Sequence, residues 1–279
     1  MLKLMYITNQ PDVAKTAEDA GVDIIFVDLE IIGKKDRQGH LDTVISDHSI
    51  SDVYRIKETL KHAELLVRVN PIYPGSKEEI DDVCRRGADI IMLPFFTTKK
   101  EAEVFVDLVD NRAKTCLLVE TPEAVANIDD ILSLGDIDMV HIGLNDLHLG
   151  YGMKFMFELL ADGTVEMLCE KIASKGIPYG FGGVARVGFG VLPSEYIIAE
   201  HYRLGSDMVI LSRSFCNVNK VNRFEEIKDI FALEVKKIRS KEREASSFCE
   251  TEFVANREQV RLRVGQYVKN LPVLNKVGL

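Results

Sequence analysis

The sequence predicts a single (β/α)8 barrel of the TIM type, and three observations lead to this fold class. The chain has 279 residues, close to the roughly 250 that one complete barrel uses. Eight short apolar runs recur along it, and helix-forming stretches separate most of them. Several of these stretches end in a glycine directly before the next apolar run, which is typical of a helix that turns into a strand.

The eight apolar runs are predicted to be buried parallel strands. They lie at residues 2–9, 24–30, 64–70, 90–96, 115–122, 139–146, 178–185 and 208–215. Each run is apolar almost throughout, which indicates strands that are covered on both faces. Eight such units in one chain favour a closed barrel over an open sheet.

The last part of the chain, residues 220–279, is predicted to be a helical extension of the same domain. Apolar residues recur at helical spacing in residues 222–244, and residues 250–271 look like a second helix. Because no linker separates the two parts, residues 1–279 form one predicted domain, an α/β barrel with extra C-terminal helices.

Composition narrows the class of protein. Hydrophobic residues make up 46% of the chain, enough for a sizeable core, and the net charge of −9 predicts no nucleic-acid partner. No apolar run is long enough to span a bilayer or to serve as a signal peptide. The five cysteines are scattered, without a CxxC pair, which predicts reduced thiols in a cytoplasmic protein.

Charged residues stand at the ends of several apolar runs. Asp28 and Glu30 end the second run, Arg68 the third, Glu120 the fifth and Asp146 the sixth. Active sites of these barrels lie at the C-terminal ends of the strands, and buried charges are costly unless they are paired or bind something. The strand ends therefore predict a polar site at the mouth of the barrel.

Glu120 and Asp146 end neighbouring predicted strands, so their carboxylates are expected to converge. Two such groups repel each other, and a shared proton or a divalent cation relieves the repulsion. Oxygen ligands with open coordination positions suit Mg²⁺ or Mn²⁺. The alternative is that each carboxylate caps the helix that follows its strand.

Arg68 occupies a position where an apolar strand would carry Val or Ile. It either forms a buried ion pair with Glu30 or Asp28, or binds a carboxylate and stabilises an enolate oxygen. Both roles are compatible. Arg213, in the last apolar run, is a further candidate for binding an anion or for an ion pair inside the barrel.

The segments that carry these residues resemble the HpcH/HpaI aldolase and citrate lyase β-subunit family of metal-dependent barrels. In chain order they are GVDIIFVDLE, VRVNP, GADIIMLPFFTTKKEAE, LLVETPEAVANIDDIL and IDMVHIGLNDLHLG. The resemblance covers roughly the first 215 residues, and the last two segments are its most specific part.

The resemblance implies particular roles. Glu120 and Asp146 match the family's metal ligands for Mg²⁺, Mn²⁺ or a similar ion. Arg68 matches an arginine that contacts the keto oxygen and carboxylate of a pyruvate-like ligand. Backbone amides at Asn145 and Asp146 would hold that carboxylate, and Glu30 matches the glutamate of the second strand.

Several positions depart from the family pattern. Ile31 stands where the aldolases commonly have a histidine that acts in proton transfer, and where the citrate lyase branch has an acid. Two loop histidines, His40 and His48, are the candidates to replace it; alternatively, both are solvated.

Three further departures surround the metal site. Leu118 replaces a glutamine, Leu144 a proline and His148 a serine. These changes leave the implied metal ligands in place and alter the expected contacts for proton transfer and substrate.

These observations predict a metal-dependent carbon–carbon lyase, a class II-type aldolase, that acts on a 2-oxo acid through a pyruvate enolate. Arg68 would stabilise the enolate, and His48, His40 or a water held by Glu30 would be the base. The alternatives are a citrate lyase-like enzyme that cleaves a CoA thioester and a degenerate barrel with a binding role. The resemblance also implies a homo-oligomer built through the C-terminal helices.

Overall fold

Eight parallel strands close into a barrel, as predicted. The computed structural model describes residues 1–33, 48–212, 214–221 and 223–271. The strands are β1 (Lys3–Ile7), β2 (Ile24–Asp28), β3 (Glu64–Arg68), β4 (Ile90–Leu93), β5 (Lys114–Val119), β6 (Met139–Ile142), β7 (Tyr179–Val184) and β8 (Met208–Leu211). Each strand pairs with the next along the chain, and β8 pairs with β1 to complete the circle.

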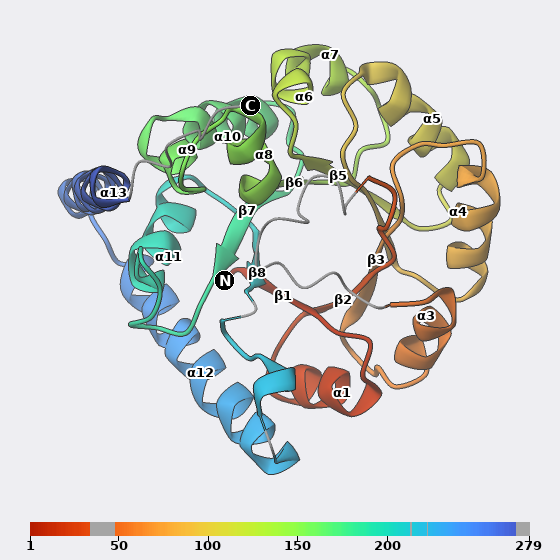
Figure 1. Cartoon of the computed structure of the whole chain (residues 1–279), viewed down its shortest axis with the longest axis horizontal. Coiled ribbons are helices and arrows are strands. Elements are labelled where there is room, and N and C mark those ends of the chain that lie inside the picture. The colour runs from red at the N-terminus through yellow and green to blue at the C-terminus, as the bar shows by residue number, and fades with distance from the viewer. Residues whose placement is uncertain (34–47, 213, 222, 272–279) are drawn as a thin grey trace, which may run out of the picture.

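Helices surround the barrel as an outer ring (Figure 1). Those that follow the first five strands are α1 (Pro11–Asp19), α3 (Ile50–Lys57), α4 (Ser76–Arg85), α5 (Lys99–Val109), α6 (Pro122–Ala126) and α7 (Ile128–Ile131). The remainder are α8 (Leu144–Gly150), α9 (Glu158–Ala161), α10 (Thr164–Ala173), α11 (Ser194–Arg203), α12 (Phe224–Ala245) and α13 (Glu250–Asn270), with a 3-10 turn at Val218–Lys220. No helix among the described residues is long and apolar enough to cross a membrane.

The glycines before the strands take the backbone conformation that the sequence pattern indicates. Gly87 precedes β4 with a φ of 87°, and Gly205 precedes β8 with a φ of 67°. Side chains other than glycine rarely adopt this left-handed region, so glycine ends each helix and turns the chain back into the barrel.

The strands end earlier than the apolar runs predict. The largest consequence concerns Asp146, whose predicted position at the end of a strand is wrong. The sixth run was expected to extend to Asp146, but β6 ends at Ile142 and α8 begins at Leu144. The amide of Leu147 already donates a hydrogen bond to the carbonyl of Gly143, at 3.2 Å. Asp146 therefore lies in the first turn of a helix, although it does not occupy the N-cap position.

Two apolar layers hold the barrel together. The smaller layer consists of alternate strand residues that face the barrel axis, among them Met5, Phe26, Met92, Leu118 and Met208. The larger layer lies between the outer face of the strands and the helices. Because successive strand residues point to opposite faces, this alternation decides which side chains reach the mouth of the barrel.

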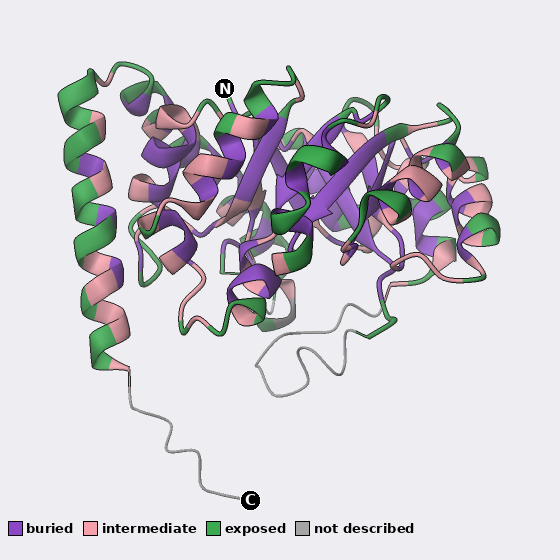
Figure 2. Ribbon diagram, turned by 90° about the horizontal axis from the view of Figure 1, so that it is seen from above, coloured by how far each residue is buried: buried purple, intermediate pink, exposed green. Residues whose placement is uncertain are grey.

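The C-terminal helices are present where the sequence predicts them. α12 lies between α11 and α1 in the ring, and its Glu242 accepts a hydrogen bond from the backbone amide of Leu2 at 2.6 Å. α13 stands outside the ring, against α9 and α11 (Figure 1), and its outward face is largely exposed (Figure 2).

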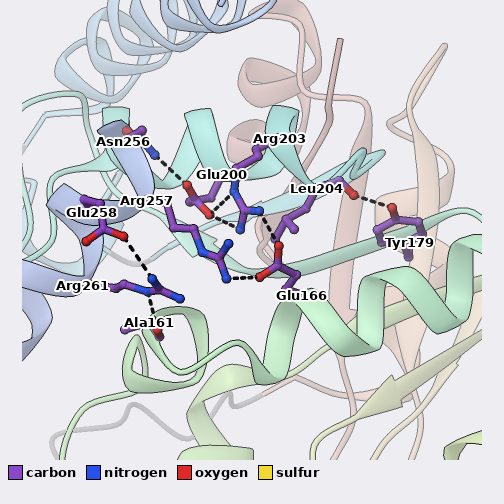
Figure 3. A network of polar contacts seen from close by, with 10 residues as sticks. All are labelled: Ala161, Glu166, Tyr179, Glu200, Arg203, Leu204, Asn256, Arg257, Glu258 and Arg261. Carbon is purple, nitrogen blue, oxygen red and sulfur yellow. Dashed lines mark hydrogen bonds and ion pairs between the residues drawn. The ribbon is translucent and has the colours of Figure 1, made fainter. Parts of the chain in front are cut away.

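A network of ion pairs attaches α13 to the barrel (Figure 3). Glu166 of α10 binds both Arg203 of α11 and Arg257 of α13, at 2.6 and 2.5 Å. Glu200, which is fully buried, binds Arg203 at 2.7 Å and accepts a hydrogen bond from the amide of Asn256 at 2.8 Å. Each carboxylate oxygen of Glu200 thus has a hydrogen-bond or ion-pair partner, which a buried charge requires.

Phe231 provides a test of how α12 contributes to stability. Its ring is fully buried, 4.9 Å from the ring of Tyr6 on β1 and 5.5 Å from that of Phe215. Phe231→Ala should lower the free energy of unfolding by about 3–5 kcal/mol, because it leaves a cavity between α12 and the barrel. Leu233→Ala, at an exposed position of the same helix, should change it by no more than about 0.5 kcal/mol. Urea denaturation measures both, and equal effects of the two variants would contradict this packing.

Candidate metal and substrate site

The structure brings the charged strand-end residues together at the mouth of the barrel. Arg68 is the last residue of β3 and is paired in register with Asp28, the last residue of β2. Glu30 lies two residues beyond β2, and Glu120 directly follows β5. Asp146 reaches the same mouth from the first turn of α8.

Asp28 fixes the position of the Arg68 guanidinium. Its two carboxylate oxygens accept hydrogen bonds from Nε and Nη2 of Arg68, at 2.9 and 2.8 Å. Glu30 approaches Nη2 at 3.4 Å, and the guanidinium lies 5.5 Å from the ring centre of Phe26. Burial lowers the pKa of Arg68, but Asp28 and Glu30 outweigh that effect and hold it above its usual range. Arg68 therefore forms the ion pair that the sequence indicates as one of its two roles, and it forms it with both acids.

Glu120 is a buried carboxylate among other charges. Its Oε1 accepts a hydrogen bond from the backbone amide of Phe95 at 3.1 Å. Burial raises the pKa of Glu120 well above its usual range, Arg68 offsets part of this rise, and the charges of Asp146 and Glu30 add to it. The charge of Asp146 thus contributes to the raised pKa of Glu120, the effect expected of two carboxylates at one barrel mouth.

Gly143 gives the Glu120 carboxylate its space. A Cβ atom at this position would lie 2.8 Å from Oε2 of Glu120 and 3.2 Å from a methyl group of Leu118. Real Cβ atoms essentially never approach another heavy atom within 3.0 Å, so the contact with Glu120 means that any other residue at position 143 would displace the carboxylate or the helix that carries Asp146.

The start of α8 places Asn145 and Asp146 in one helical turn. Asp146 is buried and Asn145 is half-buried. Backbone N–H groups in the first turn of a helix have no acceptor within the helix, which suits an anionic group. His148 does not face outward from this turn, because it is buried with Nδ1 3.1 Å from the carbonyl of Leu144.

His48 lies apart from the Glu120 and Asp146 pair. Its Nδ1 accepts a hydrogen bond from the backbone amide of Asp28 at 2.9 Å. The ring borders a separate cavity of about 290 Å³, which it shares with Asn70, Tyr73 and Glu79. Ile31, at the position of the missing family histidine, is exposed. The other two candidates, His40 and Arg213, lie outside the described residues.

The sequence analysis did not single out His141, which is buried inside the barrel. Its Nε2 is 3.2 Å from the carbonyl oxygen of Gly182, and because a carbonyl only accepts, this nitrogen carries the proton. Burial lowers the pKa of His141 to about 4, the hydrogen bond to Gly182 offsets part of that effect, and the charge of Arg68 adds to it. The alternation of β6 could have revealed it, since His141 shares the inward face with Met139.

A cavity of about 600 Å³ opens beside the carboxylate pair. Its wall includes Glu120 and Asp146, and also Thr97, Thr121 and Glu123, which the sequence analysis did not single out. The predicted metal ligands therefore border a space that is large enough for a small organic ligand.

The donor set fits a hard divalent cation. Among the described residues, no group of three or more His, Cys, Asp or Glu side chains is arranged to hold a metal. Glu120 and Asp146 would thus provide two oxygen ligands, and water or substrate the others. Mg²⁺ is commonly held in this way, by one or two carboxylates, several waters and substrate oxygens.

Comparison with known proteins identifies the family. The family model for HpcH/HpaI aldolase/citrate lyase matches residues 3–156, more than half of the chain, so the chain belongs to this family. This membership supports a lyase-type enzyme, and members of the family commonly use divalent metal ions. No curated protein matches the sequence significantly.

Two solved structures show the same fold. An HpcH/HpaI aldolase from Desulfitobacterium hafniense DCB-2 has a TM-score of 0.59 at 15% identity, over 76% of this chain and 86% of that one. A variant of the citrate synthase SbnG has a TM-score of 0.55 at 18% identity, over 75% of this chain and 85% of that one. At these identities the likeness concerns the fold alone.

The raised pKa of Glu120 predicts how the stability of the metal-free protein depends on pH. Because the folded chain holds the carboxyl proton more tightly than the unfolded chain, the stabilisation is complete below the unfolded pKa of 4.5 and is lost as pH rises through the folded pKa. One such proton weakens folding by up to about 1.4 kcal/mol per pH unit within this window.

Glu120→Gln should remove this part of the pH dependence. Urea unfolding of the wild type and the variant in EDTA, from pH 5 to pH 8, measures the difference. The variant should gain stability relative to the wild type as pH rises, and parallel curves would rule out a raised pKa of Glu120 in the folded chain.

Proposed function

We propose that the protein is a metal-dependent carbon–carbon lyase, a class II-type aldolase that acts on a 2-oxo acid. The observation that carries this proposal is the buried pair Glu120 and Asp146 beside a guanidinium, Arg68, that two other acids hold in place. Burying such charges at a barrel mouth costs folding free energy unless they are paired or bind a ligand.

Glu120 and Asp146 would hold Mg²⁺ or Mn²⁺. A cation held there would supply Lewis-acid stabilisation for negative charge that develops on the oxygens of the 2-oxo acid. The first turn of α8 would hold the substrate carboxylate through the backbone amides of Asn145 and Asp146, as the family resemblance implies.

Arg68 would stabilise the enolate. Its Nε and Nη2 atoms are used by Asp28 and Glu30, whereas no described residue forms a hydrogen bond with Nη1. The side chain is 14% exposed, enough for a ligand to approach it. A guanidinium that is already fixed in position stabilises developing charge without first having to reorganise.

The reaction needs one proton acceptor and one proton donor. A base removes the proton of the aldol hydroxyl, the carbon–carbon bond breaks, and its electron pair becomes the enolate of pyruvate as the aldehyde leaves. Protonation of the enolate carbon then gives pyruvate. We assign proton transfer to a water held by Glu30, which lies beside Arg68, and we keep His48 as the second candidate.

Two other proposals share part of this support. A citrate lyase-like CoA-thioester lyase would use the same carboxylates and arginine. A barrel with only a binding role would explain why Ile31 stands in place of the family histidine. It would not explain why Glu120, Asp146 and Arg68 occur together. The exposed Val254 and Leu262 on α13 support the further proposal that these helices join copies of the chain in a homo-oligomer.

Glu120→Gln tests the proposed lyase. A screen of 2-oxo acid aldols for Mg²⁺-dependent pyruvate release provides the assay, and the variant should lose roughly 10³-fold or more in kcat/KM because one metal ligand has lost its charge. Glu103→Gln, at a half-buried position on α5 that does not line the cavity, is the matched control and should keep full activity. A Glu120→Gln protein with unchanged activity and metal dependence would refute the assignment.

A second pair of variants identifies the base. If a water on Glu30 accepts the proton, Glu30→Gln should lower kcat by about 10²–10⁴-fold. His48→Ala should keep kcat within a few-fold, because the ring borders a different cavity from Glu120 and Asp146. The reverse pattern would assign the base to His48 and would reject Glu30.

A further inference from the structure

We propose that the cavity beside Glu120 and Asp146 selects 2-oxo acids whose distal arm carries hydrogen-bond donors and no negative charge, and that Glu123 sets this preference. The inference rests on the proposed function, because it assumes that the oxo-acid end of the ligand lies at Glu120 and Asp146. It adds the chemical class of the rest of the substrate and the residue that recognises it.

The first argument is the charge of the cavity wall. Of the described residues that line the cavity, none is a lysine or an arginine, whereas Glu120, Glu123 and Asp146 are acids. A divalent cation would offset the first and the last of these. Glu123 then remains as the negatively charged lining residue that is not a proposed metal ligand. It forms no ion pair with a described residue.

The second argument is the direction of the hydroxyl protons. Thr97 donates its hydroxyl hydrogen bond to Glu101 at 2.9 Å, and Thr121 donates to the carbonyl of Phe96 at 2.8 Å. Both hydroxyls thus direct their protons toward the protein. The buried Thr121 oxygen also accepts a hydrogen bond from the backbone amide of Ala124 at 3.1 Å. The acceptors that the cavity wall offers to a ligand away from the metal ligands are therefore the Thr97 hydroxyl oxygen and the Glu123 carboxylate.

The nearest basic residues along the chain do not alter this polarity. Lys99 donates to the hydroxyl of Ser133 at 2.9 Å, and Lys100 pairs with Glu103 at 2.8 Å. The wall therefore complements hydroxyl or ammonium groups. A second carboxylate or a phosphate in the same place would meet acceptors and a like charge, which disfavours both a dicarboxylic substrate and the phosphates of CoA.

Equilibrium binding tests the proposal without turnover. Isothermal titration calorimetry in Mg²⁺ measures the Kd of pyruvate, of 2-oxoglutarate, whose distal arm ends in a carboxylate, and of 5-hydroxy-2-oxopentanoate, whose arm ends in a hydroxyl. The wild type should bind the hydroxy acid about tenfold more tightly than 2-oxoglutarate, because the distal carboxylate of 2-oxoglutarate would be repelled by one partly solvated like charge.

Two variants assign the effect to Glu123. Glu123→Gln should tighten 2-oxoglutarate binding about fivefold to tenfold and leave pyruvate binding unchanged. Asp130→Asn, an exposed acid on α7 that does not line the cavity, changes the net charge equally and should affect none of the three ligands. Thermal denaturation of both variants confirms that they are folded.

The outcomes separate the two proposals. If pyruvate binds but 2-oxoglutarate binds as tightly as the hydroxy acid, the selectivity is refuted and the lyase proposal stands. If the selectivity is present but Glu123→Gln does not reduce it, the role of Glu123 is refuted. If pyruvate itself does not bind in Mg²⁺, the proposed function fails, and this inference fails with it.

Discussion

The bidentate ion pair between Arg68 and Asp28 is the interaction on which the rest of the site depends. It joins the ends of β3 and β2, and it holds the guanidinium where Glu30 and Glu120 also contribute to its electrostatic environment. Three carboxylates thus act on one positive charge, and a fourth, that of Asp146, acts on Glu120. Because like charges in a partly buried site repel strongly, a divalent cation is the simplest ligand that would balance this mouth.

The barrel fold converts this charge distribution into a usable site. Alternation along the strands directs Arg68 inward, while the backbone after β5 and β6 presents Glu120 and Asp146 from a strand end and a helix start. Gly143 makes their approach possible, because any side chain there would occupy the space of the Glu120 carboxylate. The cavity beside them is also bordered by Glu123, the acid that we propose to select the uncharged distal arm of the ligand.

Much of this was predictable from the sequence, and the exceptions have physical reasons. Continuous apolar runs mark strands covered on both faces, so all eight were found, and the charges that end them led to Arg68 and Glu120. The sequence predicts Asp146 on a strand because apolar character alone does not mark the residue at which β6 ends and α8 begins. The cavity around His48 depends on packing between distant segments, and Glu123 reads in the sequence only as an acid in the first turn of a helix.

The most direct test of this account is the position of a bound metal. Crystals grown with Mn²⁺ and oxalate, a stable analogue of the pyruvate enolate, should give one anomalous peak coordinated by Glu120, Asp146 and oxalate oxygens, at distances of about 2.0–2.2 Å. Arg68 should contact the oxalate while it keeps its bonds to Asp28. A peak elsewhere in the protein, or oxalate bound without metal at these two carboxylates, would contradict the central claim.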